Sequence, residues 1–244
     1  MAKQKKVVPV VGTPRGVFPM RINKYLAWKN LCTRREADTY VGKGQVLLNG
    51  TRAVLGDQVQ ETDTVEVRFR TKQYRYFAYH KPRGIITHSP GEGEEDIKAV
   101  VPTPGVFPIG RLDKDSSGLM ILTDDGRLTD KLLNPDFAHE KEYIVRVKEP
   151  LQSNFQKRIE PGVNIEGHLT KPCTVKVLGE NKFSIVLTEG KKHQIRRMCA
   201  ALGYVVSNLE RRRIMNINLD KLKPGEHRAL SGKELSDFLK ALGF

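Results

Sequence analysis

The spacing of apolar and polar positions predicts two short helices near the start of the chain. From residue 21 onward, apolar side chains recur at the three- and four-residue intervals of a helix face. Thr33 followed by Glu36 forms a capping-box pattern, which predicts the first turn of a second helix. Gly42 and Gly44 should end that helix, because glycine disfavours the helix interior.

A hairpin and a further strand are predicted after these helices. The pair Asn49 and Gly50 separates two strand-like segments, residues 45–48 and 51–54, and is typical of a type I′ turn. Residues 64–69 alternate apolar and polar side chains and predict another strand. The first part of the chain is therefore expected to form a small αα-βββ domain.

The remainder of the chain is predicted to be mainly β with inserted helices. Alternation predicts strands at residues 141–147, 171–178 and 182–188, and an apolar run predicts one at 119–122. Helical spacing appears over 151–159 and over 195–202, before Gly203, and again in a last helix with Ser231 and Glu234 at its start. That last helix should bury Leu235, Phe238, Leu239 and Leu242.

These patterns predict an α+β protein with largely antiparallel strand pairing. With 244 residues the chain can form two unequal domains. We expect a disordered basic tail over residues 1–19, a first domain over 20–69, a linker over 70–75 and a second domain over 76–244.

The net charge indicates a polyanionic partner. Lys and Arg number 42 against 28 Asp and Glu, a formal charge of +14. Solubility alone needs only about 2–8 net charges on a small domain. Several cations fall on or beside the two predicted N-terminal helices: Arg21, Lys24, Arg34 and Arg35. Their density suits contacts with nucleic-acid phosphates, although a solvated helix face would look the same.

The cysteine positions and the absence of several known motifs exclude some classes of function. Cys32, Cys173 and Cys199 lie far apart without a C-x-x-C pair, which fits a reducing, cytoplasmic compartment. The sequence contains no metalloprotease, phosphate-loop or nucleophile-elbow motif and no long apolar span. We therefore expect no metal, no nucleotide cofactor and no membrane partner, and take a monomer as the default state.

One loop combines glycines with two acids and two bases. It covers residues 110–118, GRLDKDSSG, and directly precedes the apolar strand at 119–122. An ordinary tight turn would explain the loop, because Asp and Ser bond to their own backbone and Gly permits the geometry. An active-site loop is the other interpretation.

The first domain resembles the S4 RNA-binding domain. The resemblance is carried by three segments: residues 21–26 (RINKYL), 32–38 (CTRREAD) and 44–50 (GQVLLNG). It implies RNA as the partner and says nothing about chemistry, because S4 domains occur in several unrelated RNA-binding proteins.

The second domain resembles the pseudouridine synthases that act at single ribosomal RNA sites, the RsuA-like family. Four segments carry this resemblance: residues 80–84 (HKPRG), 110–119 (GRLDKDSSGL), 140–145 (EKEYIV) and 189–198 (EGKKHQIRRM). The run at 209–217, LERRRIMNI, is most similar to the large-subunit synthase F branch. The resemblance implies isomerisation of a uridine in ribosomal RNA, with 23S RNA as the expected substrate.

The resemblance also implies roles for three residues at the reacting base. Asp113 matches the family's nucleophile. A carboxylate enclosed with an extruded base is neutralised by desolvation unless a cation keeps it ionised, and Arg196 matches the family's partner for that purpose. Tyr143 matches the tyrosine that stacks on the uracil. From the residues alone, Arg196 could be a phosphate-binding side chain and Tyr143 a core residue.

Further residues are expected along the RNA path. A target uridine must be splayed out before its glycosidic bond is accessible, and Arg111 matches the residue that fills the vacancy. It could instead form only a surface pair with Asp115. The residues expected to contact RNA by charge and hydrogen bonding are Lys81, Lys192, His193 and Arg197.

Two other functions fit parts of the sequence. A noncatalytic RNA-binding or ribosome-assembly factor would share the charge and the S4-like domain, but it need not retain Asp113, Tyr143 and Arg196. A metal-dependent nuclease would need clustered carboxylates, for which the pair Asp113 and Asp115 is the only candidate.

Overall fold

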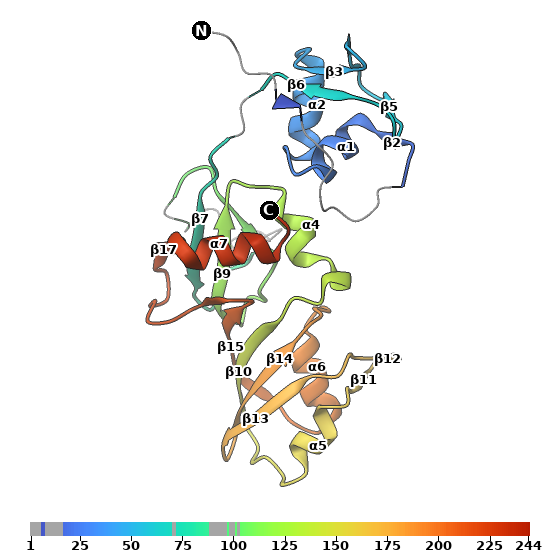
Figure 1. The fold of residues 1–244 in the computed structure, drawn as a ribbon. Helices are drawn as coiled ribbons and strands as arrows, with labels where there is room; N and C mark the ends of the chain where they lie inside the picture. Colours follow the sequence, from blue (N-terminus) through green and yellow to red (C-terminus); the bar gives the residue numbers. More distant parts are fainter. Residues whose placement is uncertain (1–5, 8–16, 70–71, 88–96, 98–100, 102) are drawn as a thin grey trace. The chain divides into compact units, whose positions relative to one another are not determined.

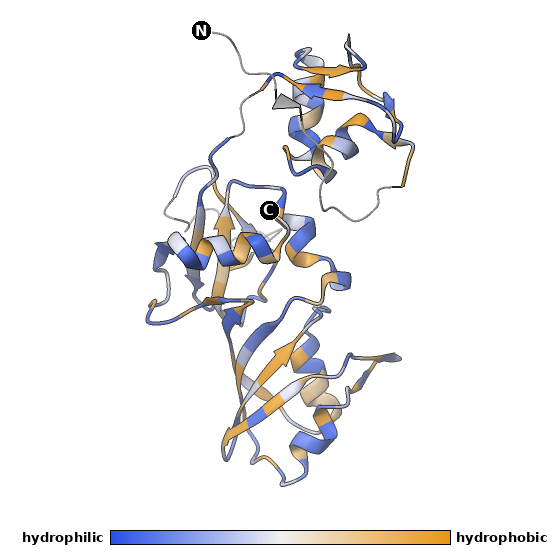
Figure 2. Ribbon diagram, in the orientation of Figure 1, coloured by the Kyte–Doolittle hydropathy of each residue, from blue (hydrophilic) through white to orange (hydrophobic). Residues whose placement is uncertain are grey.

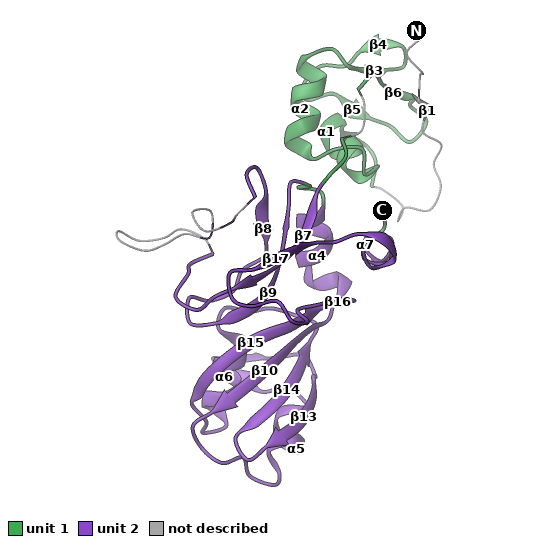
Figure 3. Ribbon diagram, turned by 90° about the vertical axis from the view of Figure 1, so that its left-hand side faces the viewer, with its two compact units in different colours: residues 1–74, 125–127, 243–244 green, residues 75–124, 128–242 purple. Residues whose placement is uncertain are grey.

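The computed structural model describes residues 6–7, 17–69, 72–87, 97, 101 and 103–244. It divides into two compact units, coloured separately in Figure 3. Unit 1 comprises residues 1–74, 125–127 and 243–244, and unit 2 comprises residues 75–124 and 128–242. Most of the tail expected over residues 1–19, and part of the linker expected over 70–75, lie outside the described residues.

Unit 1 packs two helices against short strands (Figure 1). Its elements in chain order are β1 (Lys6–Val7), β2 (Met20–Arg21), α1 (Ile22–Trp28), α2 (Arg34–Gly42), β3 (Val46–Leu48), β4 (Thr51–Arg52), β5 (Gln58–Val59) and β6 (Val65–Val67). One sheet has the order β1-β6-β3-β4, and β2 pairs with β5. The apolar helix faces close a core that includes Leu26, Ala37 and Val46.

The local predictions for unit 1 are confirmed at the helix start and at the hairpin turn. Thr33 accepts a hydrogen bond from the backbone of Glu36, and the Glu36 side chain accepts one from Thr33. Asn49 and Gly50 both have positive φ, as a type I′ turn requires. Residues 6–7 correct the expected tail, because they form β1 along β6, whose edge offers unpaired backbone groups.

Unit 2 is built on one large, mostly antiparallel sheet. Its elements are β7 (Tyr76–Lys81), β8 (Phe107–Ile109), β9 (Ser117–Thr123), α4 (Leu128–Leu133), a 3-10 turn (Pro135–Phe137), β10 (Lys141–Val147), α5 (Phe155–Ile159), β11 (Asn164–Ile165), β12 (His168–Leu169), β13 (Thr174–Gly179), β14 (Lys182–Leu187), α6 (Gln194–Ala201), β15 (Val206–Ile214), β16 (Ile217–Asn218), β17 (His227–Ala229) and α7 (Gly232–Ala241). The sheet order is β13-β14-β10-β15-β9-β7-β17, with β16 beside β15 and β8 beside β9.

Strand β9 is the buried centre of this sheet. All seven of its residues are buried, and the ribbon of this strand is largely orange in Figure 2, the colour of hydrophobic residues. It pairs in antiparallel fashion with β7 and β8, and in parallel with β15. Because β9 directly follows the loop at residues 110–116, its burial gives that loop a rigid support.

Two predicted elements differ in detail from the structure. Strand β13 begins at Thr174, after Pro172, which has no N–H to donate to a strand ladder. Helix α5 begins only at Phe155, because the backbone N–H of Leu151 bonds to the carbonyl of Glu180. Neither difference moves the element from its predicted place in the order.

The last helix lacks the predicted capping box. Ser231 makes no side-chain cap, and the Glu234 carboxylate binds the guanidinium of Arg228 instead. Leu235 and Leu239 are only half-buried, whereas the other two apolar residues of the predicted set are buried. Among the described residues, no helix is long and apolar enough to cross a membrane.

Candidate active site

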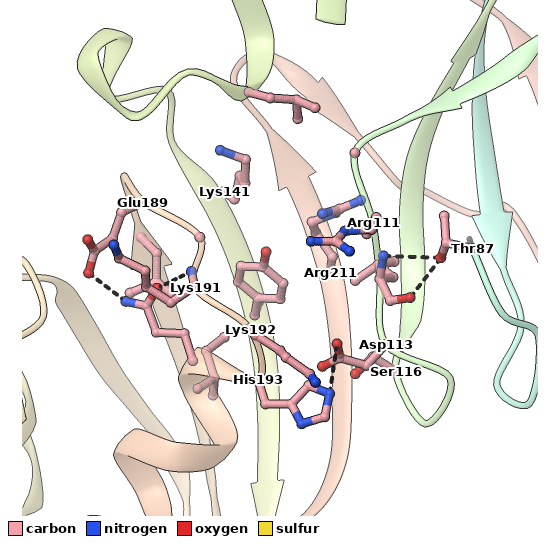
Figure 4. Close-up of a pocket in the computed structure, with 18 of the residues that line it drawn as sticks. Thr87, Arg111, Asp113, Ser116, Lys141, Glu189, Lys191, Lys192, His193 and Arg211 are labelled. Carbon is pink, nitrogen blue, oxygen red and sulfur yellow. Dashed lines mark hydrogen bonds and ion pairs between the residues drawn. The ribbon is translucent and has the colours of Figure 1, made fainter. Parts of the chain in front are cut away.

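A pocket of about 570 Å³ opens in unit 2 beside the loop at residues 110–116 (Figure 4). Its walls come from that loop, from β10 and β15, and from the segment between β14 and α6. The lining residues from the sequence predictions are Arg111, Asp113, Tyr143, Lys192 and His193. The fold therefore brings together residues as far apart in the chain as Arg111 and His193.

The loop that carries Asp113 is held by side chains from elsewhere in unit 2. The Thr87 hydroxyl donates to the carbonyl of Leu112 at 2.7 Å and accepts from the N–H of Leu112 at 3.2 Å. These bonds appear as dashed lines in Figure 4. The N–H of Ser116 donates to the carbonyl of Asp113 and closes the turn. The backbone around Asp113 is thus fixed on both sides.

Lys81 provides a second anchor for this loop. Its ammonium group is completely buried and donates to the carbonyl oxygens of Pro82 (2.9 Å), Asp113 (3.2 Å), Lys114 (3.5 Å) and Ser116 (2.8 Å). Burial lowers the pKa of Lys81 to about 8, against the opposing attraction of Asp113. The expectation that Lys81 contacts RNA is therefore corrected, because a fully enclosed ammonium cannot reach a phosphate.

The Asp113 carboxylate faces the pocket and meets His193. One carboxylate oxygen lies 3.4 Å from Nε2 of His193, as Figure 4 shows. The two side chains retain 34% and 49% of their exposure, so both remain accessible to a ligand. His193 immediately precedes α6 and has a left-handed backbone, with φ of 52°, which sets where its ring lies. The two side chains form an ion pair when His193 is protonated.

Arg196 does not pair with Asp113, which corrects the predicted contact. Its Nη2 donates to the carbonyl of Asp115 at 3.1 Å and to Oγ of Ser116 at 3.3 Å, and Nη1 reaches the carbonyl of Val206. Arg196 is also absent from the pocket wall. A side chain on the first turn of α6 meets the far end of the loop, so it supports the backbone that follows Asp113.

Tyr143 belongs both to the core and to the pocket. It is half-buried on β10 and packs against two apolar clusters of unit 2. It also lines the pocket. The sequence left a core tyrosine and a substrate-stacking tyrosine as alternatives, and the position of this ring is compatible with both at once.

The remaining predicted RNA contacts in unit 2 fall into two groups. Arg111 and Lys192 are exposed and line the pocket. Arg111 forms no ion pair with Asp115 among the described residues, so its charge is available to a ligand. Arg197 instead forms an ion pair with Glu166 and is not part of the pocket wall.

The sequence predictions missed three residues of the site: Thr87, Lys141 and Arg211. Arg211 lines the pocket although only 4% of it is exposed. Burial, followed by the positive charge of Arg211, lowers the pKa of Lys141, which also lines the pocket. Arg211 is the first of three consecutive arginines, residues 211–213, so the residue types alone do not indicate which guanidinium faces inward.

The four cations predicted on unit 1 are all exposed. Arg21, Lys24, Arg34 and Arg35 lie on β2, α1 and α2. Among the described residues, none of the four forms an ion pair with a carboxylate. Their charges are therefore free to meet phosphate groups.

Of the two carboxylates that line the pocket, Asp113 and Glu189, one is accessible to a substrate. Glu189 is buried and has a structural role, because it accepts hydrogen bonds from the backbone of Lys171 and the amide of Gln194. Asp113 is the acid that stays accessible. No three His, Cys, Asp or Glu side chains in the described part of the chain are grouped as metal ligands. One accessible carboxylate beside an aromatic ring and several cations can attack an electrophilic carbon of an anionic substrate.

Comparison with known proteins identifies the family. Residues 75–201 match the family model of RNA pseudouridylate synthases, and residues 20–65 match the S4 domain. The chain is 44% identical over 230 residues to the dual-specificity RNA pseudouridine synthase RluF of Escherichia coli K12, covering 91% of this chain and 79% of that protein. It is 33% identical to the ribosomal small subunit pseudouridine synthase A of Vibrio cholerae, with 91% and 100% covered.

A solved structure agrees with these sequence relatives. A crystal structure of a pseudouridylate synthase superposes with a TM-score of 0.66 at 28% identity, covering 91% of this chain and 99% of that one. Both the S4 domain and the α+β catalytic domain predicted from the sequence are thereby confirmed. The chain belongs to the RNA pseudouridine synthases of the RsuA and RluF type, and it is an isomerase with an N-terminal S4 domain.

Proposed function

We propose that this enzyme isomerises one specific uridine of ribosomal RNA, in the 23S RNA of the large subunit, with Asp113 as the nucleophile and no cofactor. The observation that carries the proposal is the accessibility of Asp113. Its carboxylate lies at the pocket on a loop that Lys81 and Thr87 hold by its backbone, and its side chain lies beside the half-exposed His193.

The proposed reaction begins with a uridine splayed out of the RNA into the pocket. A carboxylate oxygen of Asp113 attacks the nucleoside, and the bond between C1′ and N1 breaks with its electron pair left on the base. The base turns and its C5 forms a bond to C1′, and the bond between the nucleoside and the Asp113 oxygen breaks and frees the carboxylate. C5 then loses its proton and N1 gains one. Tyr143 stacks on the uracil throughout and is the candidate acceptor of the C5 proton.

The surrounding cations hold the RNA during this exchange. Arg111 is exposed beside Asp113 and fills the space that the extruded uridine leaves. Lys192 and His193 contact the neighbouring backbone by charge and hydrogen bonding. Arg196 acts through the loop, because its guanidinium binds the backbone and hydroxyl that follow Asp113. In this proposal it is a positioning residue.

The choice of RNA rests on the relatives and on the S4 domain. One relative is named for the small ribosomal subunit, which supports ribosomal RNA as the substrate class. The higher identity, 44% against 33%, is to RluF, which supports the synthase F branch that residues 209–217 resemble. Because the name of RluF includes the term dual-specificity, the test should examine all cellular RNA.

The proposal is tested by mapping pseudouridine in all RNA from cells with and without the gene. We expect one 23S position to lose the modification and to regain it with the wild-type gene. Asp113→Asn should not restore it, whereas the matched variant Asp115→Asn, changed on the same loop, should restore it. Restoration by Asp113→Asn would contradict the assigned nucleophile, and an unchanged map would leave the chain as an RNA-binding factor.

A further inference from the structure

Arg211 presents an unused hydrogen-bond donor at the pocket. Its Nε donates to the carbonyl of Leu119 at 2.7 Å, which fixes the guanidinium plane. Its Nη2 is buried and has no hydrogen-bond partner among the described residues. Buried polar groups in native proteins nearly always have a partner, and an exception calls for a functional explanation. Nη2 itself has almost no exposed surface, but the residue lines the pocket, so the guanidinium lies beside any ligand that enters there.

The charges around Arg211 leave room for an anion. Lys141 is a second half-buried cation of the same wall, and its pKa is lowered by burial and by the charge of Arg211. Among the described residues, neither acid of the pocket forms an ion pair with Arg211: Asp113 lies accessible beside His193, and Glu189 accepts hydrogen bonds from backbone and amide N–H groups. A substrate can therefore supply the negative charge near Arg211.

The position of Arg211 in the sheet indicates which part of a nucleotide it meets. Strand β15 lies between β10 and β9, and Arg211 is directly opposite Tyr143 on β10. Side chains of opposed residues in a sheet emerge on the same face. Figure 4 shows Arg211 on the side of the pocket formed by Arg111 and Asp113. A base stacked on Tyr143 would turn its edge toward Arg211, whereas a phosphate would stay nearer the exposed rim.

We propose that the guanidinium of Arg211 donates a hydrogen bond to a carbonyl oxygen of the target base and stabilises the negative charge that develops there. The inference rests on the proposed function. If Asp113 attacks C1′, the electron pair of the broken bond stays on the base and spreads over N1 and the carbonyl oxygens. If Asp113 instead adds to C6 of the ring, the electrons of the C5–C6 double bond move onto the carbonyl oxygen at C4. Both routes place charge where a fixed guanidinium is most effective.

The first experiment compares Arg211→Met and Arg211→Lys with Arg212→Met. Arg212 is the next residue of β15, binds Glu210, and does not line the pocket, so it is a matched control. We expect Arg211→Met to slow pseudouridine formation about 100-fold or more in single-turnover assays on RNA from cells lacking the gene, with the RNA dissociation constant changed less than about threefold. Arg211→Lys should fall between. A rate for Arg211→Met within about threefold of Arg212→Met would overturn the proposal.

A second experiment separates a bond to the base from a structural effect. The target uridine is replaced by 2-thiouridine or 4-thiouridine, because sulfur accepts hydrogen bonds more weakly than oxygen. One of the two should slow the wild-type enzyme at least about tenfold and should slow Arg211→Lys much less. This comparison uses the lysine variant, so it holds even where the methionine variant is unstable.

Two results of the second experiment would count against the role of Arg211. Equal slowing of the wild type and Arg211→Lys would overturn it. The role would also be overturned if the wild-type rate fell when a phosphate beside the target was replaced by a phosphorothioate but did not fall with either thiouridine. The partner of Arg211 would then be a phosphate. If the wild-type enzyme makes no pseudouridine at all, the proposed function fails first, and the two failures are distinguishable.

Discussion

At the scale of single residues, the enclosed ammonium of Lys81 makes stability depend on pH. The pKa of Lys81 is about 8 in the folded protein, below its ordinary value of 10.5. Between these values the unfolded chain binds a proton that the folded protein does not, so raising the pH favours folding. From pH 8 to 9.5, the free energy of unfolding of the wild type should rise by up to about 2 kcal/mol relative to Lys81→Met.

Urea unfolding of both proteins across this pH range measures the difference. The exposed Lys176 offers a control, because Lys176→Met removes a lysine that makes no buried contacts. The wild type and Lys176→Met should show the same pH dependence. The prediction would be contradicted if the wild type lost stability with rising pH relative to Lys81→Met. Hydrogen bonds to the four carbonyl oxygens would then stabilise the charged ammonium by more than burial destabilises it.

At the scale of elements, the parallel contact between β9 and β15 joins the two halves of the site. Gly118 has φ of +113°, and a Cβ there would lie 2.3 Å from the carbonyl oxygen of Arg211. Gly118→Ala must therefore separate the strands or strain the backbone. We expect it to lower the free energy of unfolding by about 2–4 kcal/mol and to reduce the rate of isomerisation, because the Asp113 loop and Arg211 both depend on this contact.

Chemical denaturation, with activity measured on the folded fraction, tests the prediction for β9 and β15. Gly179→Ala is the matched control, since that glycine lacks a positive φ and has open space around its Cβ position. Its stability should change by no more than about 0.5 kcal/mol. A Gly118→Ala protein as stable as Gly179→Ala would show that the strands can separate at this point without cost.

At the scale of the whole molecule, RNA affinity and chemistry should be separable between the two units. Reversing the charges of Arg34 and Arg35 removes two exposed cations from α2. We expect the RNA dissociation constant to rise and its dependence on salt to weaken, because fewer counterions are released on binding. The rate at saturating RNA should stay near that of the wild type, since the pocket lies in unit 2.

Binding titrations at several salt concentrations distinguish a specific contact from a general effect of charge. Lys157 and Lys176 are exposed on α5 and β13, and reversing both changes the net charge by the same amount. If this control weakens binding as much as Arg34→Glu with Arg35→Glu, the S4 domain contributes only to the overall field of the protein.

The sequence alone determined the features that depend on neighbouring residues. The capping box at Thr33, the turn at Asn49 and the strand at residues 141–147 are confirmed, because backbone preferences and side-chain period act over a few positions. The family motifs likewise located the loop of Asp113, and the structure shows a pocket beside it.

Only the tertiary structure decided which side chains meet. It buried Lys81 under the loop, directed Arg196 to the backbone beyond Asp113, and left Nη2 of Arg211 without a hydrogen-bond partner among the described residues. Each of these outcomes depends on contacts between segments that lie far apart in the chain. A charged residue carries no local sign of its eventual partner, because strand order and the parallel pairing of β9 with β15 determine which groups come within hydrogen-bond distance.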